Sequence, residues 1–319
     1  MINDDSNTEQ RIHGDALVVG NQGFGDILEH IGMTRYVASI YTGKVFFFVN
    51  SCGNWPVAEW MFRDEPRIKV CRIGKQIPGS DLKKSERLKN LTHNFYSWSQ
   101  RLPEFANTQQ GALEVDKFTA ISQTHHLYGD KYIKEEFGGV RFGESFFKAA
   151  GIPYRAKFDN FYVQREEEEE DRVYQKLNPD NEKYIFVHDF FRHPHHRRVP
   201  DIDAKIHTRF NEPIKVIRND PSESPFHQIK LYEKAEEIHC MSSSIMILID
   251  SMAASPMETT LHKKPKFLHW YVRKRAAIKN HGEQYFGSNW NVVYSPDWRN
   301  VYSPSTGNVT NLQKFLQNY

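Results

Sequence analysis

The turn Gly20–Asp26, with the sequence GNQGFGD, holds the first residues whose types and spacing could do chemistry. It follows the apolar stretch Ala16–Gly20 and precedes a run with helical spacing. Glycine lets the backbone turn tightly and approach a ligand, which makes Gly23 and Gly25 candidates for such contact. Asp26 then lies near a helix N-terminus, where an ionised carboxylate is favoured and can accept a proton from a hydroxyl. Asp26 as a simple helix cap is the alternative, and the sequence leaves both open.

A second group lies in the loop His188–Arg198, which directly follows the apolar stretch YIFVH. Arginine offers forked hydrogen bonds and histidine adds donors, so a basic loop after a strand suits a phosphate or pyrophosphate. Arg192 is the preferred phosphate contact because it is the arginine closest to the strand end. The additional candidates in this loop are His188, Asp189 and His193. No neighbouring Cys or Glu completes a metal-ligand set, so no metal site is expected. The alternative is a surface loop that is basic by coincidence.

The third group is the serine turn, defined as Ser242, Ser243 and Ser244, between a short strand and an apolar helix. A serine hydroxyl at a helix start accepts a hydrogen bond from an otherwise unpaired backbone N–H. The N–H groups and the helix dipole there favour an anion. We therefore predict an anion site at this turn, with an ordinary capped helix as the alternative. Glu237, just upstream, is a candidate for a hydrogen bond to a ribose or sugar, and a surface charge is its alternative.

Other polar residues have structural interpretations. Arg35 could bind a phosphate or pair with an acid, whereas His239 is expected to be a core residue with a partner. Asp250, in an apolar helix, is expected to be a buried polar group with its hydrogen bonds satisfied. The acidic run Glu166–Asp171 is expected to be the solvated face of a helix.

The elements that position these residues alternate along the chain. Short apolar runs rich in Val, Ile and Phe are typical of buried parallel strands. In the first half they are Ala16–Gly20, Lys44–Asn50 and Ile68–Ile73, with helices expected at Ile27–Tyr41, Val57–Phe62 and Phe142–Ala150. Phe158–Val163 is either a last strand or a crossover. In the second half a helix at Arg165–Leu177 precedes strands at Tyr184–His188, Ile214–Arg218, Ile238–Met241 and Lys266–Trp270.

This alternation predicts an α/β protein with two Rossmann-like domains facing each other across a cleft. Residues 1–13 are expected to be a disordered leader. Residues 14–160 would form the first domain and residues 161–319 the second. The tail, Tyr285–Tyr319, either packs back on the first domain or lines a sugar site. The pattern assigns no role to residues 75–135 and 275–319.

Composition narrows the function. The chain has 319 residues and a net charge of only +2, from 42 Lys and Arg against 40 Asp and Glu. A nearly balanced charge does not suit a general nucleic-acid binder. The longest apolar runs are too short for a transmembrane segment. Three cysteines without metal or redox spacing favour a reduced, cytoplasmic setting.

Taken together, these motifs resemble a known group of enzymes. The segment GNQGFGDILEHIGMTRYVA resembles the G-x-G-D opening of heptosyltransferase-like GT-B glycosyltransferases. The segments YIFVHD and LYEKAEEIHCMSSSIMILIDSM resemble the nucleotide-sugar domain of uncharacterised glycosyltransferases from bacteria and large DNA viruses. The resemblance covers most of residues 16–73 and 140–255. The downstream lysine and glycine-rich donor motif of heptosyltransferases has no clear counterpart here.

The resemblance implies a metal-independent, inverting glycosyltransferase (a hexosyl- or pentosyltransferase) without a cofactor. The first domain, with Asp26 as catalytic base, would hold a glycan acceptor, while Ser242, Ser243, Ser244 and, less directly, Arg192 would hold a nucleotide-sugar donor. Three alternatives remain: a nucleotide-sugar 2-epimerase, a polysaccharide pyruvyl transferase, and a non-catalytic glycan- or nucleotide-binding protein. The sugar, the nucleotide, the acceptor and the oligomeric state are not determined by the sequence.

Overall fold

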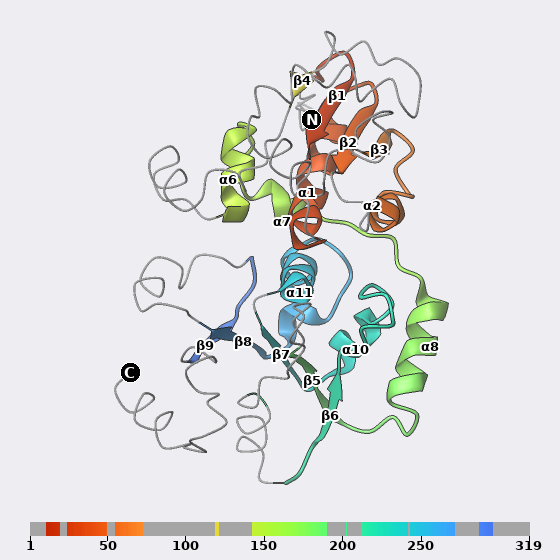
Figure 1. Ribbon diagram of the computed structural model, residues 1–319, viewed down its shortest axis with the longest axis vertical. Helices are drawn as coiled ribbons and strands as arrows, with labels where there is room; N and C mark the ends of the chain where they lie inside the picture. The colour runs from red at the N-terminus through yellow and green to blue at the C-terminus, as the bar shows by residue number, and fades with distance from the viewer. Residues whose placement is uncertain are drawn as a thin grey trace, which may run out of the picture. The chain divides into compact units, whose positions relative to one another are not determined.

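The computed structural model describes residues 11–19, 24–49, 55–72, 119–120, 142–189, 202, 212–241, 243–271 and 287–295. The chain divides into two compact units, Met1–Gln164 and Arg165–Tyr319 (Figure 1). This division falls a few residues after the boundary expected from the sequence. Each unit contains a parallel β-sheet with helices, which confirms the predicted α/β class.

The first unit is built on a four-stranded parallel sheet. Its strands are β1 (Ala16–Val19), β2 (Val45–Val49), β3 (Ile68–Arg72) and β4 (Thr119–Ala120). Its helices are α1 (Phe24–Ile40), α2 (Trp55–Met61), α6 (Phe142–Ala149) and α7 (Ala156–Asp159). The strand order β3-β2-β1-β4 means that the chain moves outward from β1 to β3 and then crosses to the other side of β1. Alternating strands and helices of this kind give a Rossmann-like half.

Helix α1 is fixed closely against α7. A Cβ atom added at Gly32 would lie 2.1 Å from the backbone oxygen of Lys157, so only glycine allows this approach. The Lys157 ammonium lies 2.7 Å from the carboxylate of Glu29, and both side chains are almost fully buried. A buried ion pair is costly to break, since either partner left alone is an uncompensated charge. The first half of α1 therefore has a well-defined position in its unit.

The structure decides between the two interpretations of Phe158–Val163. It is not a last strand, which leaves the crossover: α7 ends at Asp159 and an irregular segment follows. Phe158 and Phe161, three residues apart, are both buried, which is the spacing of a helical turn rather than of an alternating strand. Within the expected leader, Ile12 forms a parallel bridge with Tyr41, and its N–H donates to the carbonyl of Ile40 at 2.7 Å.

The second unit has a five-stranded sheet. Its strands are β5 (Tyr184–His188), β6 (Lys215–Arg218), β7 (Glu237–Met241), β8 (Lys266–Tyr271) and β9 (Asn291–Ser295). Its helices are α8 (Glu167–Leu177), α10 (Ile229–Lys234), α11 (Ser244–Ala254) and the short 3₁₀ turn η2 (Leu261–Lys263). All neighbouring strands are parallel, in the order β6-β5-β7-β8-β9. Counted within the unit, this is the doubly wound order 2-1-3-4-5.

Apolar side chains cover both faces of this sheet. On one face Phe186 packs edge-on against Tyr232 of α10, with ring centroids 4.8 Å apart. On the other, Ile185, Val187 and Met241 form a buried cluster with Ile202. Burial on both faces explains why β5 reads as a nearly continuous apolar run rather than an alternating one.

Strand β9 was not predicted, and a buried carboxylate explains how it is held. Asp250 of α11 accepts hydrogen bonds from the N–H groups of Gly287 and Ser288, both at 3.0 Å. It also accepts from the Ser288 hydroxyl at 2.7 Å and from Nε1 of Trp290 at 3.0 Å. The expectation that Asp250 is a satisfied buried group is confirmed. These contacts fix the segment that leads into β9.

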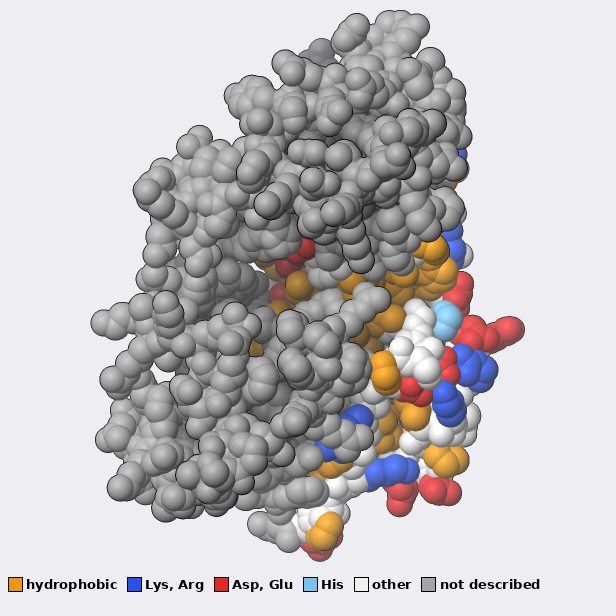
Figure 2. All heavy atoms as spheres, in the orientation of Figure 1, with side chains coloured by type: hydrophobic (Ala, Val, Ile, Leu, Met, Phe, Trp, Pro, Cys, Tyr) orange, Lys and Arg blue, Asp and Glu red, His pale blue; other side chains and the backbone are white. Residues whose placement is uncertain are grey.

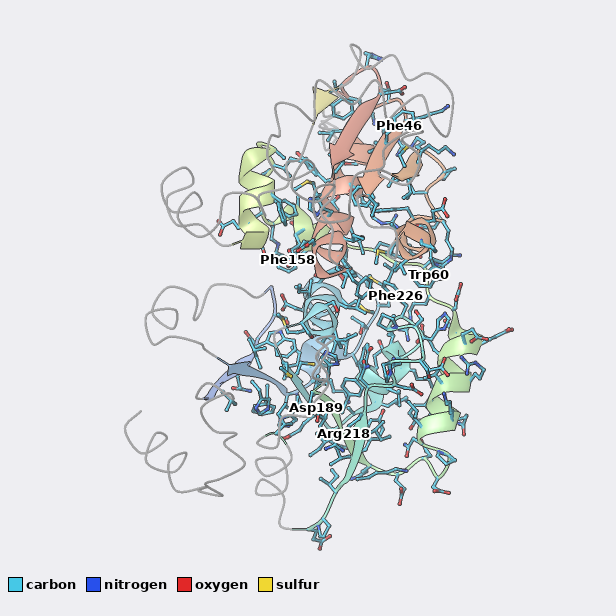
Figure 3. The ribbon with its side chains drawn as sticks, viewed as in Figure 1. Phe46, Trp60, Phe158, Asp189, Arg218 and Phe226 are labelled. Atoms are coloured by element: carbon cyan, nitrogen blue, oxygen red, sulfur yellow. The ribbon has the colours of Figure 1, made fainter. Side chains whose placement is uncertain are left out.

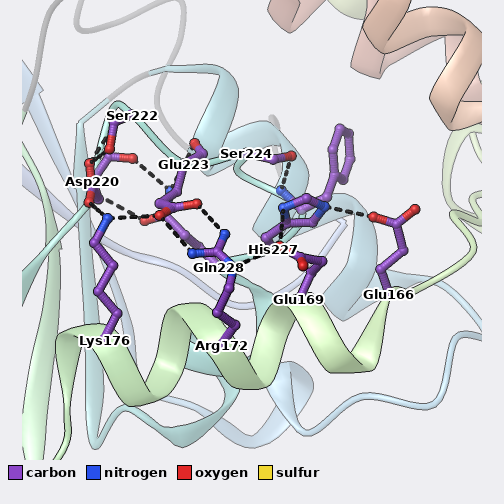
Figure 4. Close-up of polar contacts among 11 residues, drawn as sticks. Glu166, Glu169, Arg172, Lys176, Asp220, Ser222, Glu223, Ser224, His227 and Gln228 are labelled. Carbon is purple, nitrogen blue, oxygen red and sulfur yellow. Dashed lines mark hydrogen bonds and ion pairs between the residues drawn. The ribbon is translucent and has the colours of Figure 1, made fainter.

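The acidic run on α8 forms a mixed-charge surface, where acidic and basic side chains gather together (Figure 2). Arg172 and Lys176 both contact Glu223, each at 2.7 Å, and Glu166 lies 2.7 Å from His227 (Figure 4). These ion pairs fasten the loop between β6 and α10 to α8. Glu170 departs from the expected solvated face: it is 1% exposed and pairs with Arg165.

Candidate functional site

The G-x-G-D turn follows β1, the strand at which the strand order of the first sheet reverses: β2 and β3 lie on one side of β1 and β4 lies on the other. In open α/β sheets, ligands bind at the carboxyl ends of the strands, at such a switch point. Gly25 and Asp26 lie in the first turn of α1, whereas Gly23 lies outside the described residues. Asp26 is the third residue of the helix rather than the residue before it, and it is partly buried. The positive end of the α1 dipole favours negative charge at this place.

Arg35, two turns further along α1, does not belong to this site. Its guanidinium makes two hydrogen bonds to the carboxylate of Asp64, at 2.7 and 2.9 Å, and a third to the carbonyl of Met61 at 3.0 Å. It also lies over the rings of Phe62 and Tyr162. A bidentate pair of this kind fixes the arginine in place. Of the two interpretations from the sequence, pairing with an acid is confirmed.

In the second unit, the loop that begins at His188 follows β5, and the serine turn follows β7. These two strands are adjacent, and the strand order of this sheet reverses between them. A doubly wound sheet of this order binds its ligand in the crevice between those two strands. The tertiary structure therefore brings together, at one sheet edge, two segments that lie some 50 residues apart in the sequence.

Asp189 and Arg218 form an ion pair at this edge. Nε of Arg218, the last residue of β6, donates to the Asp189 carboxylate at 3.2 Å (Figure 3). Asp189 is 3% exposed and Arg218 is partly exposed, so the aspartate holds an arginine whose side chain still meets the surface. Sequence reasoning missed Arg218. The available signal was its position at the end of the run IKVIR, at the carboxyl edge of the sheet.

His188, the last residue of β5, is buried, and this burial lowers its pKa to about 4. The physical cause is that a buried imidazolium loses its hydration, which disfavours the charged form. The ring is therefore neutral near pH 7 and can offer a hydrogen bond but no positive charge. Arg192 and His193, predicted from the same loop, lie outside the described residues.

The serine turn does cap α11. The hydroxyl of Ser243 accepts a hydrogen bond from the N–H of Met246 at 3.4 Å, and its carbonyl accepts from the N–H of Ile247 at 3.1 Å. Ser244 is the first residue of the helix, and Ser242 lies outside the described residues. The dipole of this 11-residue helix has its positive end at the switch-point edge.

Glu237 is not brought to this edge. It is the first residue of β7, at the opposite end of the strand from the serine turn, and it is 7% exposed. Its carboxylate lies 3.1 Å from Nε2 of His239, whose Nδ1 lies 3.0 Å from Nε2 of His269. Glu237 is thus neither a ligand contact at the serine turn nor a surface charge. His239 is a core residue with partners, as expected.

Neither a candidate metal centre nor a candidate membrane-spanning helix is found among the described residues. Within these residues, no three His, Cys, Asp or Glu side chains are grouped so that they could hold a metal ion. Among the described helices, none is both long enough and apolar enough to cross a bilayer.

Comparison with known proteins gives similar solved structures. No protein-family model matches the sequence, and no curated protein matches it. A glycosyl transferase family 9 structure from Veillonella parvula is 8% identical and has a TM-score of 0.46, covering 90% of this chain and 87% of that chain. The E. coli heptosyltransferase WaaC with ADP is 14% identical, with a TM-score of 0.43, covering 96% of this chain and 99% of that chain. E. coli ADP-heptose LPS heptosyltransferase II is 11% identical, with a TM-score of 0.42, covering 88% and 90%.

Proposed function

We propose that this protein is a glycosyltransferase that moves a sugar from a nucleotide-diphosphate donor to the hydroxyl of a glycan acceptor. One observation carries the proposal. In each of the two α/β units, a motif that the sequence predicts to contact a ligand follows a strand at which the strand order of the sheet reverses. That edge is where open α/β sheets bind ligands. The first unit offers an acid there, and the second offers groups suited to an anion.

The second unit would hold the donor diphosphate. The α11 N-terminus, capped by Ser243, directs N–H groups and a positive dipole toward the switch-point edge. Arg218, oriented by Asp189, adds a positive charge at the end of β6, which lies on the other side of β5 from β7. These groups would stabilise the negative charge that develops on the departing diphosphate, so the proposal requires no metal ion. Arg192, Ser242 and Ser244 remain candidates for the same role.

Asp26 would act as the catalytic base. The acceptor oxygen attacks the anomeric carbon, and a new glycosidic bond forms as the bond from that carbon to the donor phosphate oxygen breaks. The bonding electrons leave with the nucleoside diphosphate, and the acceptor proton moves to the Asp26 carboxylate. A single displacement of this kind inverts the configuration of the anomeric carbon.

Ligand binding and the base can be tested separately. A thermal-shift screen with UDP-glucose, UDP-N-acetylglucosamine, GDP-mannose and ADP-glucose should show stabilisation by at least one donor, because a ligand that binds the folded state raises its stability. With that donor, Asp26→Asn should bind normally while release of the diphosphate falls by about 10²-fold or more. A matched control is Glu167→Gln, which removes an exposed acid from the first turn of α8 and should change neither property.

Three outcomes would contradict the proposal. Normal turnover by Asp26→Asn would exclude the base assignment. Conversion of UDP-N-acetylglucosamine to its C2 epimer without an acceptor would indicate an epimerase instead. If a donor binds but no glycan acceptor in a tested series leads to release of diphosphate, the protein is a non-catalytic binding protein.

A further inference from the structure

His30 lies one helical turn after Asp26 in α1, in a position that links the proposed base to the core of the first unit. Its side chain is fully buried, at 0% exposure. Nδ1 of the ring lies 2.7 Å from the backbone oxygen of Asp26. A carbonyl oxygen only accepts hydrogen bonds, so Nδ1 must carry the proton and donate it. The contact therefore selects one tautomer of the imidazole.

The ring is neutral and held from two sides. Burial lowers the pKa of His30, and the hydrogen bond to the Asp26 backbone and the charge of Asp26 oppose this shift only in part. The ring centroid lies 4.7 Å from that of Phe146 on α6 and 6.1 Å from that of Phe47 on β2. The imidazole thus ties the backbone of Asp26 to both the sheet and a neighbouring helix.

An apolar side chain would fill this space without the cost of burying a polar ring. Histidine adds what a phenylalanine lacks, a donor to a carbonyl in the first turn of α1. That turn is the end of a helix, where the backbone frays most readily. A second hydrogen bond to the Asp26 carbonyl, besides the i to i−4 bond of the helix, restrains the residue that carries the proposed base.

We propose that His30 is a positioning residue: its Nδ1–H fixes the backbone of Asp26 so that the carboxylate stays in place for proton transfer. This inference rests on the proposed function. His30 itself is fully buried and acts on a main-chain atom, so it takes no part in the chemistry. Small displacements of a catalytic group are costly, about 10²-fold in rate for 1 Å.

The same helix provides a matched control. Thr34 is one turn further along, and its hydroxyl donates to the carbonyl of His30 at 2.8 Å. Thr34→Val removes a bond of the same type, also buried, without touching Asp26. His30→Phe keeps an aromatic ring and removes the donor. His30→Asn keeps a donor, and an asparagine amide can reach a carbonyl four residues earlier, as Asn160 does with Ala156 at 3.3 Å.

Turnover of UDP-glucose, GDP-mannose and ADP-glucose, followed as release of diphosphate, is measured for each variant. We expect His30→Phe to lower kcat about tenfold with KM changed less than twofold, the pattern of a lost transition-state interaction. His30→Asn should recover part of this loss, and Thr34→Val should match the unchanged protein. Equal losses in His30→Phe and Thr34→Val, or a loss confined to KM, would overturn the inference.

A second measurement needs no variant. Nitrogen-15 NMR of the full chain at neutral pH should show His30 as a neutral ring with the proton on Nδ1, and a proton on Nε2 alone would refute the inference. Asp26→Asn separates the two proposals. If Asp26→Asn turns over normally, the base assignment on which this inference rests fails. If Asp26→Asn is inactive while His30→Phe turns over normally, only the role of His30 fails.

Discussion

Arg218, at the end of β6, donates a hydrogen bond from Nε to the buried carboxylate of Asp189, which directly follows β5. The pair joins the carboxyl ends of the neighbouring strands β5 and β6, at the edge where the strand order of the second sheet reverses. It leaves the arginine oriented by a buried acid and partly exposed. An arginine held in this way is suited to an anionic ligand, because its geometry is set before the ligand arrives.

Replacement of Arg218 by alanine should therefore weaken binding of UDP, GDP or ADP by about tenfold, since a charge-assisted hydrogen bond contributes about 1.5 kcal/mol or more. Isothermal titration calorimetry at two salt concentrations measures this effect. Arg172→Ala, which removes an arginine from the α8 surface, is the control and should leave affinity unchanged. Equal affinities for the Arg218→Ala and unchanged proteins would place the diphosphate elsewhere.

The ion pair between Glu29 and Lys157 should be important for stability. Lys157→Met removes the ammonium that lies 2.7 Å from the buried Glu29 carboxylate, and we expect a loss of about 3–5 kcal/mol in the free energy of unfolding. The double variant Glu29→Gln with Lys157→Met should recover a large part of that loss. Urea unfolding of the two single variants and the double variant completes the cycle. Strict additivity would show that the two side chains do not interact.

Asp250 should be required for attachment of β9. Asp250→Ala removes the acceptor of four hydrogen bonds, from the N–H groups of Gly287 and Ser288, the Ser288 hydroxyl and the indole N–H of Trp290. At about 1 kcal/mol for each lost bond, the free energy of unfolding should fall by roughly 4 kcal/mol. Ser288→Ala removes only one donor and should cost about 1 kcal/mol. Chemical denaturation measures both, and hydrogen exchange at Gly287 and Ser288 should rise in Asp250→Ala.

His188 should make stability depend on pH. Its pKa is lowered from 6.5 to about 4 in the folded protein, so the unfolded chain binds more protons between these values. The contribution of His188 to the free energy of unfolding is therefore fully present above pH 6.5. It is lost as the pH drops toward 4, and the loss amounts to about 3 kcal/mol. The lowered pKa of His30 acts in the same direction. The free energy of unfolding should depend less steeply on pH in His188→Gln, as measured by urea unfolding from pH 7 to pH 4.5. An unchanged slope would contradict the role given to His188.

Local patterns were sufficient to predict most elements. Strands β1 to β3 and β5 to β8 match apolar runs, and α1, α6, α8 and α11 match helical spacing within a few residues. The Ser243 cap was also predictable, because it depends on neighbours three and four residues away. Phe158–Val163 could not be resolved in the same way, since a short run of aromatic residues fits either a strand or a helical turn.

By itself, then, the sequence determined an α/β protein with motifs placed after particular strands, because periodicity, glycine turns and caps act over a few residues. Only the tertiary structure decided the strand orders, and hence that β5 and β7 are neighbours and their two loops share one edge. It also decided the pairing of Arg218 with Asp189 and the addition of β9. These relationships depend on packing between distant segments, and the pattern of residues along the chain does not encode which segments meet.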